Sequence, residues 1–492
     1  MEPVLSIKPL LAVLVSLVVV PILVSSRTPN VREAWTFVAA TAKFGIVVSM
    51  VPAVLGGERL VYTLAEVLPG VPIAFSVDPL GLLFALVASS LWIVTSAYSI
   101  GYMRGLKEHG QTRYFCFFAV ALSATMGVAF SANLLTLYLF YELLSLATYP
   151  LVTHHQDKEA RTSGRKYLVY ILGTSIGMVL PAMLLCYQMS GTLTFSGQGF
   201  MAKTGSGTVM TLLLFMFVFG FAKAALIPFH GWLPAAMVAP TPVSALLHAV
   251  AVVKVGVFSI VRVLTGVFGI QLLSSLDLGV VLCVVASCTI LIASLIALTQ
   301  DNLKRLLAFS TIGQLAYIVL GVGLLSPKGI TGGLLHIAMH AFGKITLFFC
   351  AGAIFVATGK RNISEMAGIG RRMPLTMTAF FLGALSITGL PPAGGFLSKW
   401  YLVLGSLEAH RMAVLGVLLV SSLLNAAYLM PIVYRAFFWP AKEALFENKF
   451  QEAPLFCVVP LMLTAFLSIL LLFYPEPFFR LASMVARGVT GG

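Results

Sequence analysis

Long apolar stretches, separated by short polar loops, run along almost the whole chain. A stretch of about 20 apolar residues has the length of a helix that crosses the hydrocarbon core of a bilayer. By this criterion the pattern predicts about fourteen transmembrane helices. They are expected near residues 8–25, 35–55, 79–100, 115–131, 133–153, 167–189, 208–228, 242–265, 277–298, 304–324, 330–356, 374–405, 412–435 and 454–474. The predicted fold class is therefore an all-α polytopic membrane protein.

Two of these helices, the seventh and the twelfth, contain prolines that interrupt them. Pro228 removes one backbone donor near the end of the seventh helix, and further prolines follow it closely. In the twelfth, Pro391 and Pro392 withdraw donors from the carbonyls four positions earlier. Irregular backbone at membrane depth is tolerated where protein or a water-filled cavity covers it, and transporters place ion sites at such breaks. The two breaks therefore mark candidate functional positions.

A broken helix that recurs five helices later indicates paired structural repeats. Helices 4 to 8 and 9 to 13 are the predicted repeats, and because five is an odd number the two halves must be inverted. The connection 56–78 alternates apolar and polar residues between Gly and Pro, which favours a hairpin or an amphipathic cap. The predicted regions are an N-terminal part with this hairpin (1–113), a first repeat (114–268), a second repeat (269–436) and a C-terminal loop with the last helix (437–492).

Composition agrees with a membrane protein and narrows its chemistry. Hydrophobic residues make up 59% of the chain and charged residues 10%, and the mean hydropathy is +0.99. A net charge of +14 would favour nucleic-acid binding in a soluble protein, but here membrane topology explains it, so no nucleic-acid partner is expected. The six cysteines are isolated, without a CxxC pair. We therefore expect no redox centre, no cofactor and no metal in this chain.

Lys and Arg are concentrated in the loops that follow odd-numbered helices. The positive-inside rule places those loops in the cytoplasm and both termini outside a bacterial or archaeal cell membrane. The stretch 9–24 has the length of a signal peptide but no convincing cleavage site, so it is interpreted as the first helix.

Four lysines lie deep inside predicted helices, where a lipid-facing helix should carry none. They are Lys223, Lys254, Lys344 and Lys399. On insertion scales a lysine at the centre of a spanning helix costs about 3 kcal/mol, so each needs a partner, water or a function. The acids lie in loops or near helix ends except Glu142. The sequence thus predicts four buried cations and one buried anion.

Glu142 and Lys223 are the expected ion pair, since no other deep acid exists to compensate a deep lysine. A purely structural pair is the alternative. Apolar replacements of buried pairs often stabilise a protein, so a role in stability alone is the weaker interpretation. Making and breaking the pair would switch the proton affinity of Lys223.

In the eleventh helix, His336, His340 and Lys344 are spaced i, i+4 and i+8, which places them on one face over roughly 12 Å. Each could simply bond a neighbouring helix, but three titratable groups in register favour a proton relay. A metal site is the other option, although no carboxylate or thiol completes a ligand set nearby. In the eighth helix, His248 and Lys254 are both candidate residues of the proton relay. They are about 120° apart around the axis, so they should face different neighbours.

Charged and histidine residues also crowd the loop after the fifth helix. We interpret this loop as a solvated face or a subunit contact rather than a site. Its residues are His154, His155, Asp157, Lys158, Glu159, Arg161, Arg165 and Lys166.

The motifs together resemble a known family. Glu142, the segment FGFAKAALIPFHGWLPAAMVAPTPVSALLHA, TQDNLKRLLAFSTIGQLAY at 299–317, HIAMHAFGKITLFF and GLPPAGGFLSKW are similar to the antiporter-like subunits of respiratory complex I. They resemble still more closely the D subunit of Mrp-type cation/proton antiporters and its counterpart in membrane-bound hydrogenases. The resemblance runs from about residue 75 to about residue 440.

The resemblance implies a fourteen-helix fold with inverted five-helix repeats, discontinuous helices 7 and 12, and protonatable groups along the membrane midplane. Relatives vary between Lys and Glu at the position of Lys399, and some lack the histidine at position 248. Direction and coupling ion are therefore not fixed. The implied proton path has Glu142 and Lys223 at the input, Lys254 in the first half-channel, Lys344 with His336 and His340 at the centre, and Lys399 at the exit side.

The predicted function is proton translocation, without redox chemistry of its own, by a membrane subunit of a larger complex. Its partners would be other membrane subunits and protons, in an Mrp-type Na⁺/H⁺ antiporter, where Na⁺ is a further partner, or in a related respiratory or hydrogenase complex. One alternative is a quinone-interacting subunit of an NADH dehydrogenase-like oxidoreductase, against which the lack of a cofactor motif counts. The other is an independent secondary transporter, for which the sequence shows no distinct central pocket.

Overall fold

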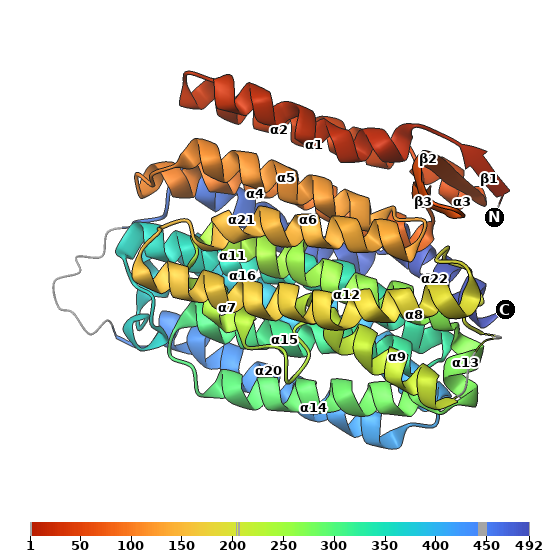
Figure 1. Cartoon of the computed structure of the whole chain (residues 1–492). Helices are drawn as coiled ribbons and strands as arrows, with labels where there is room; N and C mark the ends of the chain where they lie inside the picture. The colour runs from red at the N-terminus through yellow and green to blue at the C-terminus, as the bar shows by residue number, and fades with distance from the viewer. Residues whose placement is uncertain (1, 203, 205–206, 441–449, 492) are drawn as a thin grey trace.

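The computed structural model describes residues 2–202, 204, 207–440 and 450–491. Helices lie side by side in one bundle, and both ends of the described chain lie at the same end of it (Figure 1). Twelve helices of the described chain are long and apolar enough to cross a membrane. The two expected segments missing from this set are the seventh and the twelfth, which contain shorter apolar helices at Gly207–Gly220 and Pro374–Thr388. The polytopic helical fold is confirmed.

The elements follow the expected order. The N-terminal part comprises β1 (Glu2–Leu5), α1 (Lys8–Ser25), α2 (Pro29–Val48), α3 (Val51–Leu55), β2 (Glu58–Leu68), β3 (Val71–Val77) and α4 (Pro79–Gly105). The next part comprises α5 (Gln111–Ala129), α6 (Leu134–Val152), α7 (Lys158–Thr174), the π-helical turn η1 (Ser175–Val179), α8 (Leu180–Ser190), α9 (Gly207–Gly220), the 3₁₀ turn η2 (Ala222–Ala224), α10 (Trp232–Ala235), the 3₁₀ turn η3 (Ala236–Val238), α11 (Thr241–Ala245), the π-helical turn η4 (Leu246–Val250), α12 (Val252–Val263) and the π-helical turn η5 (Leu264–Phe268).

The later part of the chain contains the second broken helix and ends in a short amphipathic helix. Its elements are α13 (Ile270–Ser275), α14 (Leu278–Leu298), α15 (Leu303–Gly323), α16 (Pro327–Thr358), the 3₁₀ turn η6 (Ile363–Glu365), α17 (Ile369–Arg372), α18 (Pro374–Thr388), α19 (Gly395–Glu408), α20 (Met412–Phe438), α21 (Leu455–Phe473) and α22 (Glu476–Thr490).

The expected hairpin in the 56–78 connection is confirmed. Strands β2 and β3 pair antiparallel, and β1 adds to β2 in parallel. The hairpin is tied to the bundle, because the Asn133 amide nitrogen donates to the Pro72 carbonyl at 2.6 Å and the Ser76 amide donates to the Phe130 carbonyl at 2.6 Å. The hairpin therefore covers the helix ends on that side.

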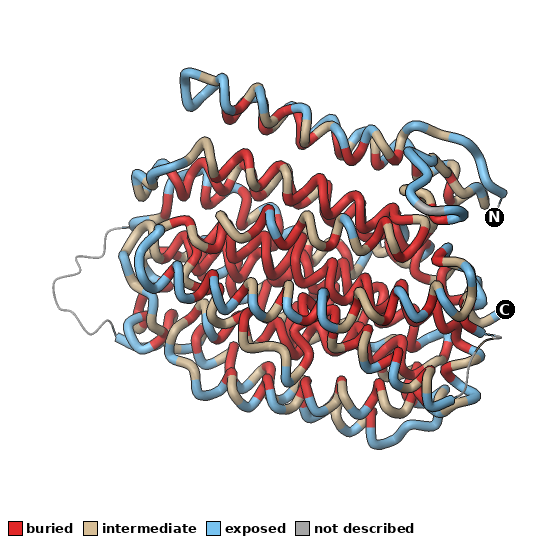
Figure 2. The backbone as a smooth tube through the Cα atoms, in the orientation of Figure 1, coloured by how far each residue is buried: buried red, intermediate tan, exposed pale blue. Residues whose placement is uncertain are grey.

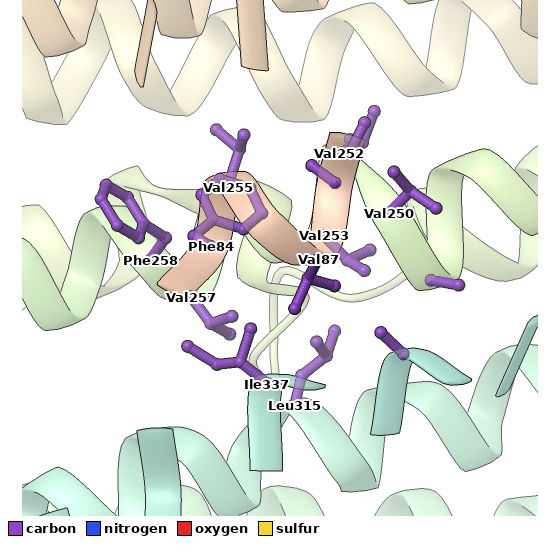
Figure 3. Close-up of a cluster of buried hydrophobic side chains, with 14 of the residues drawn as sticks. Phe84, Val87, Val250, Val252, Val253, Val255, Val257, Phe258, Leu315 and Ile337 are labelled. Atoms are coloured by element: carbon purple, nitrogen blue, oxygen red, sulfur yellow. The ribbon is translucent and has the colours of Figure 1, made fainter. Parts of the chain in front are cut away.

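The most buried helices form the centre of the bundle (Figure 2). We compare the share of residues that is buried in the most apolar window of each span. This share is 100% in Thr241–Phe268 and 94% in Leu303–Gly323. It is only 33% in Lys8–Ser25 and in Met412–Phe438. Valines of α12 pack there against Phe84 of α4, Leu315 of α15 and Ile337 of α16 (Figure 3). A charged side chain on these helices therefore lies in the buried centre of the bundle.

Both predicted helix breaks are present. Helix α9 ends at Gly220 and is followed by η2, and an irregular segment containing Pro228 connects it to α10. Helix α18 ends at Thr388 and is capped by Gly389, whose φ of 87° lies in the left-handed region that favours glycine. Pro391 and Pro392 precede α19. The assignment of the repeats and their boundaries stays a prediction.

Two features differ from the expectation. The sixth span begins at Lys158 rather than near 167, because Asp157 caps the helix by accepting from the Ala160 amide at 2.7 Å and the helix extends through polar residues. Helix α22 was not predicted, since its charges interrupt the apolar run. It buries one face, including Phe478 and Leu481, against α4 and α16.

Candidate functional site

The central contact of the bundle joins a lysine of α12 to a histidine of α16. Lys254 Nζ lies 2.6 Å from His340 Nδ1, and both side chains are buried. The His340 ring stacks on that of His336 with centroids 5.8 Å apart. The i, i+4 spacing of the two histidines on one helix produces this stacking, as the sequence predicts.

His336 connects α16 to its neighbours on both ring nitrogens. Nδ1 lies 2.8 Å from Ser398 Oγ on α19, and Nε2 lies 3.1 Å from Gln314 Oε1 on α15. Its ring is also 5.4 Å from that of Tyr317. His336 therefore sits between the central pair and the second broken helix.

Lys399 lies directly against the second break. Its Nζ donates to the carbonyls of Ile387 at 2.9 Å and Thr388 at 3.0 Å. These are the carbonyls whose donors Pro391 and Pro392 withdraw, so the break supplies the acceptors of the lysine. The interruption of the helix and the buried lysine therefore depend on each other, because the lysine bonds to the carbonyls that the interruption leaves free.

Lys399 is also linked to the rest of the path through an aromatic ring. Its Nζ lies 4.9 Å from the centroid of the Tyr317 ring, which contacts His336. The Tyr317 hydroxyl donates to Ser421 Oγ at 2.7 Å. The Tyr317 ring therefore contacts both His336 and Lys399 and links the central pair to the second break.

Lys344, one turn after His340 on α16, points to α15 instead. Its Nζ donates to Ser310 Oγ at 2.7 Å, and the Tyr428 hydroxyl donates to the same oxygen at 2.9 Å. The Tyr428 hydroxyl also contacts the Asn425 side chain at 2.5 Å. Lys344 thus starts a hydroxyl chain toward α20 rather than bonding the histidines directly.

The expected ion pair between Glu142 and Lys223 is not formed. Lys223 Nζ donates to the Tyr141 carbonyl at 2.6 Å and to Ser145 Oγ at 2.7 Å. Both carboxylate oxygens of Glu142 are buried without a hydrogen-bond partner among the described residues. Tyr141 and Ser145 share one face of α6, whereas Glu142 is turned about 100° away from Tyr141 around that helix. This offset explains why Lys223 bonds to Tyr141 and Ser145 and not to Glu142.

His248 is wholly buried, and neither of its ring nitrogens has a hydrogen-bond partner in the described chain. Its ring lies 4.7 Å from that of Phe348 on α16. His248 and Lys254 were expected to face different neighbours. They contact different residues, Phe348 and His340, of the same helix.

The four predicted lysines share a feature that the sequence does not reveal. Within the described ranges, none of them lies within ion-pair distance of a carboxylate, and each bonds a neutral oxygen or an imidazole nitrogen. An amine can make such bonds whether or not it carries the extra proton. A proton can therefore leave any of them without breaking a salt bridge.

Lys43 is not one of the four lysines that the sequence predicts to lie deep, but the structure buries it as well. It is wholly buried in α2, where its Nζ donates to Ser16 Oγ at 2.6 Å and to the Leu122 carbonyl at 3.1 Å. Trp92 lies beside it, with 5.1 Å between Nζ and the ring centroid. Lys43 belongs to the N-terminal helices and shares no contact with the groups of α12 and α16 described above.

The hydroxyl and amide groups that hold the path were missed from the sequence. Ser310, Gln314 and Tyr317 contact Lys344, His336 and Lys399 from one face of α15. Their spacing of i, i+4 and i+7 is the signal that could have identified them.

Comparison with known proteins identifies the family of this chain. The family model described as NADH:quinone oxidoreductase/Mrp antiporter, TM, matches residues 131–425, and that of the NADH-ubiquinone oxidoreductase (complex I) chain 5 N-terminus matches residues 70–115. NADH-quinone oxidoreductase subunit N of Desulforudis audaxviator is 36% identical over 395 residues, covering 79% of this chain and 78% of that protein. The A subunit of the Na⁺/H⁺ antiporter of Alkalihalophilus pseudofirmus is 32% identical over 435 residues, covering 83% of this chain. The chain spans about half, 53%, of the length of that antiporter protein.

Two solved structures share the fold. A chain of the Mrp complex from Dietzia sp. superposes with a TM-score of 0.85 at 23% identity, covering 98% of this chain and 97% of that one. A chain of the membrane-bound sulfane sulfur reductase, described as an archaeal respiratory membrane complex, gives a TM-score of 0.86 at 24% identity, covering 99% and 98%. Both neighbours are parts of multisubunit membrane complexes. The chain belongs to the NADH:quinone oxidoreductase/Mrp antiporter transmembrane family.

Proposed function

We propose that this chain moves protons across a bacterial or archaeal cell membrane as one component of a larger membrane complex. The observation that carries the proposal is the connected set of buried lysines and histidines from Lys254 through His340 and His336 to Lys399. Each group can hold or release a proton without separating an ion pair. Water molecules would complete the links that the side chains do not span.

Lys223 and Glu142 form the proposed entry region. Lys223 lies at the first break, and Gly256 of α12 packs against the backbone of Lys223 and Ala224. Glu142 has two buried oxygens without a partner in the described chain, so it is a candidate proton acceptor beside this lysine. A proton on Glu142 would change the field at Lys223, which gives electrostatic coupling without direct contact.

The driving partner lies outside this chain. Its relatives bear the names of quinone oxidoreductase and of Na⁺/H⁺ antiporter subunits. We propose that other subunits couple the proton path to redox chemistry or to Na⁺ movement. Proton flux in vesicles, measured once with an electron donor and once with a Na⁺ gradient, distinguishes the two.

Replacing Lys223 or Glu142 by Ala tests the function itself. Both variants should abolish proton uptake by vesicles containing the complex, as followed with a pH-sensitive dye, while blue-native gels show unchanged assembly. Lys43→Met is the matched control, because Lys43 is equally buried but belongs to the N-terminal helices. Normal proton uptake in both alanine variants, or an equal loss in Lys43→Met, contradicts the proposal.

We propose further that both termini lie outside the cell. The concentration of Lys and Arg in the loops after odd-numbered spans supports this orientation. A reporter enzyme active only outside the cytoplasm, fused to either terminus, should be active. An inactive reporter, with active fusions in the loop 106–110, would reverse the orientation.

A further inference from the structure

Two loops at one end of the bundle bring three histidines around a single carboxylate. The α4–α5 loop supplies Glu108 and His109, and the α6–α7 loop supplies His154 and His155. Glu108 Oε2 lies 3.7 Å from His155 Nδ1, 3.8 Å from His154 Nε2 and 3.9 Å from His109 Nδ1. Residues far apart in the sequence therefore converge on one oxygen atom.

His154 is the most buried member of this cluster. It is wholly buried, and neither ring nitrogen has a hydrogen-bond partner among the described residues. Its position is fixed, since Arg113 Nη2 donates to its carbonyl at 2.8 Å and the Tyr114 ring packs at its edge. A buried imidazole without partners loses the hydrogen bonds that it would make to water. Such a group needs an explanation.

We propose that Glu108, His109, His154 and His155 bind a divalent transition metal ion, with Zn²⁺ as the ion that fits best. Imidazole nitrogens with one carboxylate are a ligand set that Zn²⁺ takes in tetrahedral geometry. At metal–ligand distances of about 2.0–2.1 Å, tetrahedral ligand atoms lie about 3.4 Å apart. The measured separations of 3.7–3.9 Å need only small rotations of the side chains to reach that value.

The geometry of the set supports one shared site. Ligand atoms of Glu108, His109 and His154 all lie within 4.8 Å of one another. The ring centroids of His154 lie 5.0 Å from His109 and 5.6 Å from His155. His155 Nδ1 lies 3.7 Å from the same Glu108 oxygen, so all three imidazoles border this carboxylate.

The unpartnered ring of His154 favours a metal ligand over a purely structural histidine. Neither ring nitrogen has a hydrogen-bond partner among the described residues, and an imidazole nitrogen can offer its lone pair to a metal ion. The sequence favours a solvated face for this loop, but a solvated face does not account for a wholly buried histidine.

Metal binding here would join the loop after α4 to the loop after α6. Glu108 and His155 also line a cavity of about 690 Å³ at this end of the bundle, together with Lys304 and Arg361. An ion held by these side chains would place a divalent charge at the edge of the cavity and fix its rim. The bound ion is thus positioned to stabilise this end of the chain and to alter access to the cavity.

The test uses the full chain in detergent, purified with a tag that contains no histidine and stripped with EDTA. Isothermal titration with Zn²⁺ should show one saturable ion per chain, and Co²⁺ should give the intense visible absorption of a tetrahedral site. Glu108→Gln and His154→Ala should weaken binding by about tenfold or more. His109→Ala should do the same without affecting folding, because this side chain is exposed.

His410→Ala is the matched control, because His410 is an exposed histidine in the α19–α20 loop, outside this cluster. It should bind Zn²⁺ as the parent chain does. The proposal is overturned if the parent chain shows no saturable binding, or if His109→Ala and Glu108→Gln bind Zn²⁺ with the affinity of the parent. Loss of binding in His410→Ala would also overturn it, since the ion would then lie elsewhere.

Discussion

Lys254 on α12 and His340 on α16 share one short hydrogen bond, with 2.6 Å between Nζ and Nδ1, in the most buried part of the bundle. Two cationic groups cannot both hold an extra proton at this distance without strong repulsion. The pair therefore holds at most one such proton at a time. His340 Nε2 is buried and has no hydrogen-bond partner among the described residues.

The first prediction follows from this sharing. Lys254→Met and His340→Phe should each lower proton transport by about tenfold or more, because either removes one site of the shared proton. If the pair acts as a unit, the double variant should be no slower than the slower single variant. Proton uptake by vesicles with equal amounts of assembled complex measures all three.

A multiplicative loss in the double variant would show that the two side chains act independently. Near-normal transport in Lys254→Met would remove the pair from the path. The control is again Lys43→Met, which deletes a buried lysine of the N-terminal helices.

Most of the fold could be predicted from the sequence, because hydrophobic length and proline positions are local signals. The breaks at Pro228 and at Pro391 and Pro392 were found for this reason. Helix α22 was not, since a short amphipathic helix has no membrane-length apolar run. Its contacts with α4 and α16 depend on tertiary structure.

The site was predicted less completely, because a residue's type indicates whether it is buried in the membrane but not which neighbours its side chain contacts. The lysines of the path are buried as expected. The predicted pairing of Glu142 with Lys223 was wrong. It was inferred from charge balance, which does not take into account that the side chains of Tyr141 and Glu142 leave α6 in different directions. The sequence could not show that Lys399 donates to the carbonyls at the end of α18, because this contact depends on how α19 lies against α18.

The second prediction concerns the packing of the first break. A Cβ added to Gly256 would overlap the backbone nitrogen of Ala224 and the carbonyl carbon of Lys223. Gly256→Ala should therefore displace η2 and with it Lys223, lowering proton transport or the amount of assembled complex. Gly416→Ala is the control, because nothing lies within 4 Å of its added Cβ. Equal transport and yield in both variants would contradict the close approach.

The third prediction concerns Asp78 and Arg262, which form a two-point ion pair at the start of α4. Arg262 Nη2 donates to Asp78 Oδ1 at 2.8 Å, and Nη1 contacts Oδ2. Burial alone would raise the pKa of Asp78, but Arg262 outweighs it and holds that pKa below its usual value. The pair therefore contributes stability above the unfolded-state pKa of about 3.9 and loses it as pH falls through the lower folded pKa.

Asp78→Asn should destabilise the protein by about 3 kcal/mol, because it leaves Arg262 without its partner. The variant keeps the helix cap, since an asparagine oxygen can still accept from the Gly81 amide. The variant should unfold at a lower temperature, as measured by size-exclusion chromatography of heated samples. Its proton transport per assembled complex should be unchanged. Loss of transport at full stability would place this pair in the path instead.

The fourth prediction concerns Lys399, whose Nζ closes the second helix break by donating to the carbonyls of Ile387 and Thr388. A purely structural lysine needs only to donate these bonds. Lys399→Arg keeps the donors and a charge that does not leave at physiological pH. If Lys399 releases a proton in each cycle, the arginine variant should assemble normally but lose proton transport.

Lys399→Met also distinguishes the structural role of this lysine from its role in proton release. It roughly keeps the volume but leaves two buried carbonyls without a donor, at a cost of about 1–3 kcal/mol each, so its assembly should be reduced as well as its transport. Proton uptake normalised to assembled complex should therefore be lost in both variants, whereas thermal stability should fall only with Met. An arginine variant that transports protons at a near-normal rate would assign Lys399 to holding the break and remove it from the proton path.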